Sequence, residues 1–264
     1  MKTIPGTLKD FYNISAVSYL NTKPFLFGLL QEKLDHWFKL TLDIPSVCAD
    51  KLIKGHADIG LVPVAVIPSL KNPHIISDYC IGANGAVKTV ALVSELPISN
   101  LSKIYLDYQS RTSVELLKIL LRDYWHKDVQ LLKSAPGYES RINGETGALI
   151  IGDRTIGLDR QYPYYYDLGE AWKEMTGLPF VFAAWVANKP VSSEFVKEFN
   201  AAIGLGLSNI KKVIDKIAFN HPYFSLEDYF TKYIDYNLDG PKRKALKLFL
   251  KKINMDEEQM VQFV

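Results

Sequence analysis

Up to about residue 190, short apolar segments alternate with segments of helical periodicity. Strands are predicted where short runs of apolar or alternating residues lie between turn residues, and helices where apolar residues recur with the α-helical period. The predicted strands are 11–17, 37–44, 57–62, 74–83, 87–94, 103–107, 129–132, 147–151 and 180–187. Predicted helices begin at Pro24, Pro45, Pro63 and near Val114, and 192–264 shows helical periodicity throughout. This order is typical of α/β proteins, whose ligands lie at the carboxyl ends of parallel strands.

The strand–helix alternation stops and restarts once. After the turn Asn84-Gly85 the strand 87–94 carries the chain out of the first unit, and a new strand begins at Lys103. The apolar strand 180–187 can bring the chain back. We therefore predict two α/β lobes with a ligand cleft between them. The predicted first lobe is 1–93 with 189–264, which includes the C-terminal helices, and the second lobe is 94–188.

A polar turn joins the first predicted strand to the first predicted helix. It reads Val17-Ser18-Tyr19-Leu20-Asn21-Thr22-Lys23-Pro24, and a proline suits the first turn of a helix. Backbone N–H groups and short polar side chains at such a turn can hold a carboxylate or a phosphate. Asn21 and Thr22 are therefore candidate ligand-binding residues, although an isolated turn of this kind is more often only a helix cap.

A second turn of the same kind follows the strand 103–107. It contains Ser110, Arg111, Thr112 and Ser113 and precedes a helical pattern. Three hydroxyl groups and a guanidinium, which matches a carboxylate at two points, are more than a helix cap requires. A cap with a solvated arginine remains the simpler interpretation. Together the two turns indicate a ligand with two acidic groups, held between the lobes.

Composition excludes several other classes of function. The 264 residues carry a net charge of only +2, which gives no reason to expect nucleic acid or a membrane surface as a partner. Cys48 and Cys80 lack a CxxC partner and are expected to be buried free thiols, and the five histidines show no metal-ligand spacing. There is no glycine-rich nucleotide motif, which argues against a nucleotide cofactor. The first ten residues lack the apolar core of a signal peptide, which favours the cytoplasm.

Six segments of this chain resemble chorismate dehydratase, the first enzyme of the futalosine route to menaquinone. They occur in order, and the segments are YLNT-P at 19–24, DIGLVPV at 58–64, SRTSV at 110–114, LIIGD at 149–153, YPYYYDLGEAW at 162–172 and TGLPFVFAAW at 176–185. The resemblance implies a periplasmic-binding-protein type II-like fold. It also implies that the chain removes water from chorismate, a dicarboxylate, to give 3-[(1-carboxyvinyl)oxy]benzoate without a metal or an organic cofactor.

The resemblance also suggests roles for particular residues. Asn21 is a candidate to orient the leaving hydroxyl or the enolpyruvyl arm, and Thr89 is a candidate for a short hydroxyl residue expected near that position. Arg111 with its neighbouring hydroxyls is expected to bind one carboxylate, so that Arg111→Ala abolishes turnover. Two proton acceptors are considered, Asp153 and the enolpyruvyl carboxylate of the substrate itself. Of the tyrosines at 162–166, which otherwise pack a long loop, at most one, taken as Tyr165, is expected to contact the substrate.

Other functions fit the same pattern. The main alternative is a non-catalytic small-carboxylate-binding protein of the same fold, because fold does not decide function. The missing signal peptide argues against an exported receptor, and the absence of a helix-turn-helix before Phe11 argues against a ligand-sensing regulator. A dehydratase or lyase for another cyclic acid is also compatible with the sequence. Nothing in the sequence specifies the oligomeric state.

Overall fold

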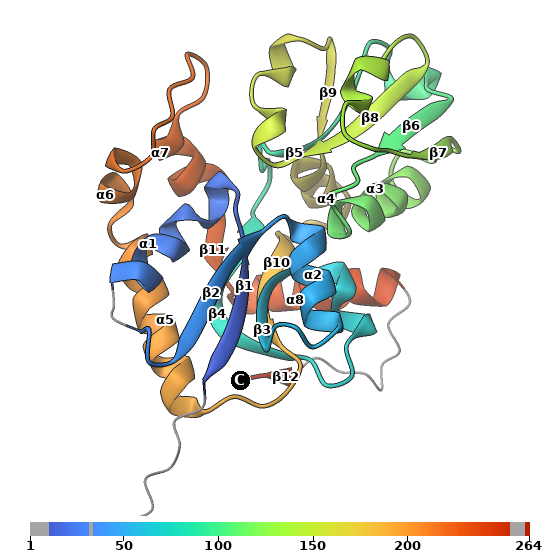
Figure 1. Ribbon diagram of the computed structural model, residues 1–264. Coiled ribbons are helices and arrows are strands. Elements are labelled where there is room, and N and C mark those ends of the chain that lie inside the picture. The colour runs from blue at the N-terminus through green and yellow to red at the C-terminus, as the bar shows by residue number, and fades with distance from the viewer. Residues whose placement is uncertain (1–10, 32–33, 254–261) are drawn as a thin grey trace, which may run out of the picture.

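Two β-sheets, each covered by helices, form the two lobes of the chain (Figure 1). The computed structural model describes residues 11–31, 34–253 and 262–264. The strands of the first sheet are β1 (Tyr12–Val17), β2 (Phe38–Asp43), β3 (Ile59–Pro63), β4 (His74–Ala83), β10 (Phe180–Ala187), β11 (Asp235–Asn237) and β12 (Gln262–Phe263). Those of the second sheet are β5 (Val90–Ser94), β6 (Lys103–Leu106), β7 (Gln130–Lys133), β8 (Thr146–Ile151) and β9 (Tyr164–Asp167). The predicted two-lobed α/β architecture is confirmed.

The strand order explains where the cleft lies. The first sheet runs β11-β4-β10-β3-β1-β2, with β12 beside β4, and the second runs β7-β6-β8-β5-β9. Because β1 is parallel to β2 and β3, the carboxyl ends of all three lie at one edge of the first sheet. In the second sheet β6 is parallel to β8, and β5 is antiparallel to β8, so the start of β5 lies beside the ends of β6 and β8. These two edges face each other across the cleft.

The helices begin close to the predicted positions in the first half of the chain. They are α1 (Lys23–Gln31), α2 (Pro45–Ile53), α3 (Thr112–Asp123), α4 (Leu168–Thr176), α5 (Ser193–Leu207), α6 (Ile210–Asp215), α7 (Leu226–Asp228) and α8 (Gly240–Lys252). Pro45 is the first residue of α2, and Gly55 ends that region at a φ of 73°. The helical turn predicted after Pro63 is present as the 3₁₀-helix Val64–Ser69.

The structure shifts both predicted lobe boundaries. β5 pairs with β8 and β9, so the second lobe already includes residues before 94. β10 pairs antiparallel with β3 and β4, so the chain has returned to the first lobe well before residue 188. Every residue of β10 is buried, which is why its sequence is continuously apolar.

Two predictions of local structure are wrong. Residues 164–167 form the edge strand β9 and not a long loop, because their backbone pairs with β5. The tail is not helical throughout, since β11 and β12 both pair with β4. Alternation of apolar and polar residues across 234–238 was an available signal for β11, whereas β12, only two residues long, is defined by its pairing partner.

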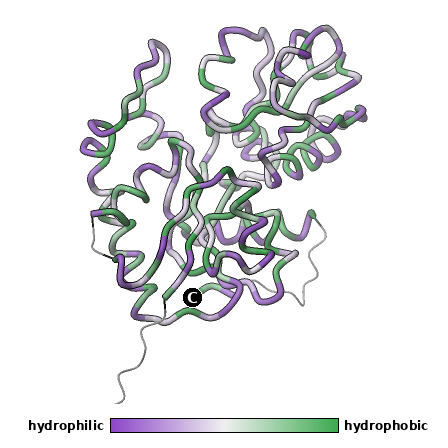
Figure 2. Tube along the Cα trace, in the orientation of Figure 1, coloured by the Kyte–Doolittle hydropathy of each residue, from purple (hydrophilic) through white to green (hydrophobic). Residues whose placement is uncertain are grey.

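Close packing of α1 on α5 fixes the first polar turn. A Cβ atom added to Gly28 would lie 1.8 Å from the carbonyl oxygen of Ala202, and one added to Gly206 would lie 1.9 Å from that of Pro24. Only glycine allows this approach of two helix backbones. α1 is thereby held against α5, and the turn before α1 is held at the end of β1. Figure 2 shows hydrophobic residues concentrated along the central strands of the lower lobe, whose core this packing completes.

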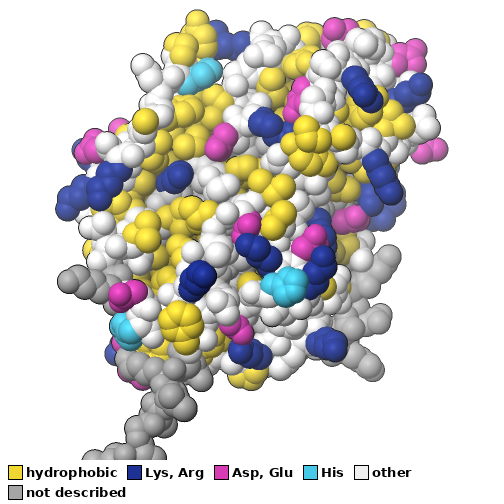
Figure 3. Space-filling model, in the orientation of Figure 1, with side chains coloured by type: hydrophobic (Ala, Val, Ile, Leu, Met, Phe, Trp, Pro, Cys, Tyr) yellow, Lys and Arg dark blue, Asp and Glu magenta, His cyan; other side chains and the backbone are white. Residues whose placement is uncertain are grey.

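The surface shows mixed charge. Lys, Arg, Asp and Glu side chains are interspersed over the face drawn in Figure 3. Within the part of the chain that the structure describes, no helix has the length and apolarity needed to cross a membrane. Cys48 and Cys80 are both buried and free, as predicted.

Candidate active site between the lobes

A pocket lies at the edge where the two sheets face each other. Its polar wall residues come from both lobes and are Tyr19, Asn21, Thr89, Ser110, Thr112 and Ser113. Among the described residues that line it, none carries a formal charge. The free space within the pocket is about 60 Å³. An anion held in this pocket would therefore be stabilised by hydroxyl, amide and backbone dipoles.

Asn21 and Thr22 occupy the 3₁₀ turn Leu20–Thr22 that precedes α1. Asn21 lines the pocket, as expected of a ligand-binding residue. Thr22 is fully buried, and its hydroxyl donates to Asn21 Oδ1 at 3.2 Å. The backbone oxygen of Asn21 accepts from the Tyr236 hydroxyl at 3.0 Å. Thr22 therefore supports Asn21 and does not itself line the pocket.

Thr89 lies just before β5, where the chain enters the second lobe. It lines the pocket, and its Oγ1 lies 2.8 Å from the hydroxyl oxygen of Tyr229. The backbone just before Thr89 is held by Asp167, the N-cap of α4. That carboxylate accepts from the N–H groups of Val87 and Lys88 at 2.7 to 3.1 Å. Burial raises the pKa of Asp167, and these N–H donors oppose the rise.

The second polar turn leads into α3 and contributes three hydroxyl groups to the pocket. Ser110 Oγ accepts from the N–H of Ser113 at 3.0 Å, which caps the helix. Thr112 Oγ1 accepts from the N–H of Ala65, in the first lobe, at 3.2 Å. The Ser110 hydroxyl therefore caps the helix, the Thr112 hydroxyl contacts the first lobe, and both residues also line the pocket. The amino end of this 12-residue helix adds a favourable field for an anion.

Arg111 does not line the pocket, contrary to the expectation that it binds a carboxylate of the ligand. Its guanidinium forms an ion pair with Asp50 of α2, in the opposite lobe. The sequence could not indicate this partner because the two residues lie 61 positions apart. Arg111 thus joins the lobes at the rim of the cleft.

Asp153 also lies outside the pocket lining. Its carboxylate accepts from the backbone N–H of Leu20 at 3.2 and 3.3 Å, across the cleft. Burial raises the pKa of Asp153, while the Leu20 N–H and the charge of Lys23 oppose the rise. This carboxylate holds the first polar turn against the second lobe.

Tyr165 is likewise outside this pocket. Its hydroxyl donates to the backbone oxygen of Lys88 at 2.8 Å, next to Thr89. Burial raises the pKa of the Tyr165 phenol, which therefore stays protonated. Tyr165 lines a separate space of about 410 Å³, together with Lys88 and His221. Its contact with Lys88 supports the chain segment that carries Thr89.

Several residues of the site were not predicted. Tyr19 lines the pocket, its hydroxyl donates to Gln109 Oε1 in the second lobe, and its ring packs on Gly152. Gly152 has a φ of 67°, and a Cβ atom there would lie 2.7 Å from Cε2 of Tyr19. The glycine directly after the apolar strand 147–151 was the available signal for this close contact.

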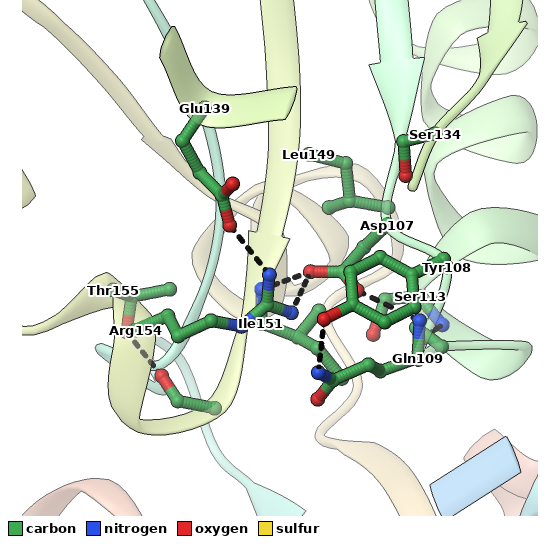
Figure 4. A network of polar contacts seen from close by, with 12 residues as sticks. Asp107, Tyr108, Gln109, Ser113, Ser134, Glu139, Leu149, Ile151, Arg154 and Thr155 are labelled. Atoms are coloured by element: carbon green, nitrogen blue, oxygen red, sulfur yellow. Dashed lines mark hydrogen bonds and ion pairs between the residues drawn. The ribbon is translucent and has the colours of Figure 1, made fainter. Parts of the chain in front are cut away.

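A polar network behind Tyr19 holds the edge of the second sheet (Figure 4). Asp107, at the end of β6, forms an ion pair with Arg154 at 2.5 Å and accepts from the N–H of Ile151 at 2.9 Å. Arg154 also pairs with Glu139 at 2.7 Å. The Tyr138 hydroxyl donates to Asp107 at 3.0 Å. Burial raises the pKa of Asp107, and the charge of Arg154 opposes the rise. These contacts tie β6 to β8 at the edge of the second sheet that carries the second polar turn.

No metal centre is visible in the described part of the chain. Among residues 11–31, 34–253 and 262–264, no group of three His, Cys, Asp or Glu side chains is placed to hold a metal ion.

Comparison with known proteins assigns the family. A family model described as menaquinone biosynthesis matches residues 12–254, nearly the whole chain. The chain belongs to this family. Among its relatives is a protein of Thermus thermophilus named chorismate dehydratase, 27% identical, with 92% of this chain and 96% of the relative covered.

Solved structures agree on the fold. A protein from Archaeoglobus fulgidus superposes with a TM-score of 0.75 at 15% identity, covering 92% of this chain and 96% of that one. A Candida albicans protein, described as having the generic periplasmic binding protein fold, gives a TM-score of 0.62 at 11% identity. The superposition covers 96% of this chain and 98% of that one. At these identities the likeness concerns the fold alone, and it confirms the predicted periplasmic-binding-protein-like architecture of this family member.

Proposed function

We propose that this chain is a chorismate dehydratase, a hydro-lyase that converts chorismate to 3-[(1-carboxyvinyl)oxy]benzoate and water for menaquinone biosynthesis through futalosine. The observation that carries the proposal is the meeting of two polar turns, one from each lobe, at a single uncharged pocket. Chorismate has two carboxylates, and each turn offers dipoles and hydroxyls that suit one of them. Family membership and the Thermus thermophilus relative support the same reaction.

The reaction asks the protein to stabilise negative charge. Loss of the proton from the ring carbon that bears the ether oxygen spreads charge through a ring double bond onto the ring carboxylate. Hydroxide then leaves the neighbouring carbon, and the ring becomes aromatic. We assign the ring carboxylate to the α3 turn, with Ser110 and Ser113, because preoriented donors stabilise such charge at low cost. Asn21 and Thr89 then serve the leaving hydroxyl or the enolpyruvyl arm.

The proton acceptor in this proposal is the enolpyruvyl carboxylate of the substrate. Among the described residues that line the pocket there is no carboxylate and no histidine. Asp153 accepts from the N–H of Leu20, which argues against a role as base. The proton and the departing hydroxide together form the water that is released.

The test is incubation of the purified protein with chorismate, following by chromatography the loss of chorismate and the appearance of the aromatic enolpyruvyl ether. Turnover that Asn21→Ala and Thr89→Val reduce by about a hundredfold, a typical effect of removing a preorganised donor, supports the dehydratase. Asn209→Ala is the matched control, because its amide donates to Leu205 O at the end of α5 and does not line the pocket.

Asp153→Asn separates the two proton acceptors. The amide oxygen can still accept from the Leu20 N–H, but the side chain can no longer act as a base. Activity within about threefold of the original supports the substrate carboxylate, since loss of a true general base costs about a hundredfold or more. Saturable chorismate binding without turnover would instead favour the alternative, a non-catalytic small-carboxylate-binding protein.

A further inference from the structure

We propose that Tyr229 is a positioning residue of the pocket, whose buried hydroxyl holds the hydroxyl of Thr89 in place at the pocket wall. The kinetic consequence of this inference rests on the proposed dehydratase function. The contact that carries the inference is the one between Tyr229 and Thr89, whose hydroxyl oxygens lie 2.8 Å apart. It joins a C-terminal helical segment to the start of β5.

Tyr229 reaches the pocket from a distant part of the sequence. It begins the π-helical turn Tyr229–Tyr233, directly after α7 in the first lobe, whereas Thr89 leads into the second sheet. The side chains of Tyr229 and Thr89 are both almost fully buried, with 1% of each residue exposed. Single π-helical turns occur often at functional sites, and this one turns the phenol inward.

Thr89 is the member of this pair that lines the pocket. In the described part of the chain, Tyr229 is the hydrogen-bond partner of its hydroxyl. A hydroxyl held by a buried partner keeps a fixed orientation at the pocket wall. In the proposed reaction this hydroxyl would face the leaving hydroxyl or the enolpyruvyl arm.

The phenol of Tyr229 is protonated. Burial raises its pKa far above the usual value of a phenol, and its side-chain hydrogen bonds oppose the rise. The carboxylates of Asp153 and Asp167 raise it further. The phenol therefore keeps its proton over the whole range in which the enzyme would be assayed.

The kinetic test is a double-mutant cycle with Tyr229→Phe and Thr89→Val. We expect Tyr229→Phe to lower kcat about tenfold with little change in KM, the effect of one lost hydrogen bond. In the Thr89→Val background the same substitution should change kcat less than about twofold, because Tyr229 acts only through Thr89. Independent, multiplicative effects of the two substitutions would overturn the inference, as would a Tyr229→Phe variant as active as the original protein.

Tyr12→Phe is the matched control. Tyr12 is also buried, and its hydroxyl accepts from the N–H of Ser192 at 3.2 Å at the opposite end of β1 from the pocket. Tyr12→Phe removes one buried phenol hydroxyl from the same lobe as Tyr229→Phe does. If the activity of Tyr229→Phe fell only because the protein became less stable, Tyr12→Phe should lose activity as well. Thermal unfolding of both variants measures the loss of stability directly.

A measurement without substrate separates failure of this inference from failure of the proposed function. In proton NMR of the whole protein we expect a slowly exchanging phenol hydroxyl resonance that Tyr229→Phe removes and Thr89→Val shifts. If chorismate is not turned over but this resonance behaves as expected, the dehydratase proposal fails and the contact between Tyr229 and Thr89 stands. If the resonance is absent, or Thr89→Val leaves it unchanged, the inference about Tyr229 is refuted.

Discussion

Arg111→Ala distinguishes a ligand clamp from a contact between the lobes. Arg111 pairs with Asp50 at the rim of the cleft, and their side chains are 37% and 46% exposed. An ion pair this exposed contributes about 0–1 kcal/mol, so its loss should lower activity by no more than about fivefold. Removing an arginine that binds a substrate carboxylate in a buried site costs about 2–5 kcal/mol, which is roughly thirtyfold to several thousandfold.

The assay is kcat/KM for chorismate in Arg111→Ala, Asp50→Ala and the double variant. We expect all three to lie within about fivefold of the original protein, and the double variant to match the single ones, because each breaks the same pair. Lys118→Ala is the control, since it breaks an exposed pair with Glu115 on the same helix. A loss above about a hundredfold for Arg111→Ala, with Asp50→Ala near normal, would refute the reasoning and return Arg111 to the ligand site.

Two further predictions concern the cleft. Gly152→Ala should lower the free energy of unfolding by about 1–2 kcal/mol because residue 152 has a positive φ. The close contact between the added methyl group and the ring of Tyr19 should lower it further. Gly55→Ala is the control, because Gly55 has a φ of 73° and a Cβ atom added there has no atom within 4 Å. This variant should lose only the stability that the positive φ costs. Equal unfolding midpoints for the two variants would therefore contradict the predicted contact between residue 152 and Tyr19. Burial raises the pKa of Asp153 in the folded protein, so its contribution to stability is present below the usual aspartate pKa and is lost as pH rises through the raised pKa. As pH rises through that window, Asp153→Asn should therefore become more stable relative to the original protein. Denaturant unfolding measures the difference in free energy of unfolding between the two proteins. A difference that stays the same at every pH would exclude the effect.

The tyrosines show why a motif does not reveal a role. The cluster at 162–166 suggested one contact with the substrate, and Tyr165 instead supports the backbone of Lys88. No sequence motif marked Tyr19 or Tyr229 as a site residue. Tyr19 nevertheless lines the pocket, and Tyr229 forms a hydrogen bond with Thr89. A phenol offers the same chemistry wherever it occurs, so only its neighbours in space decide its use.

Local features of the sequence determined the α/β pattern, the two polar turns and the free cysteines. These follow from side-chain periodicity, prolines at helix starts and glycines at helix ends, which act over a few neighbouring residues. The tertiary structure alone decided that Arg111 meets Asp50, that Asp153 faces the N–H of Leu20 and that Tyr229 reaches Thr89. Each of these contacts joins segments far apart in the chain. Their partners are set by how the two sheets pack and close, which no local pattern encodes.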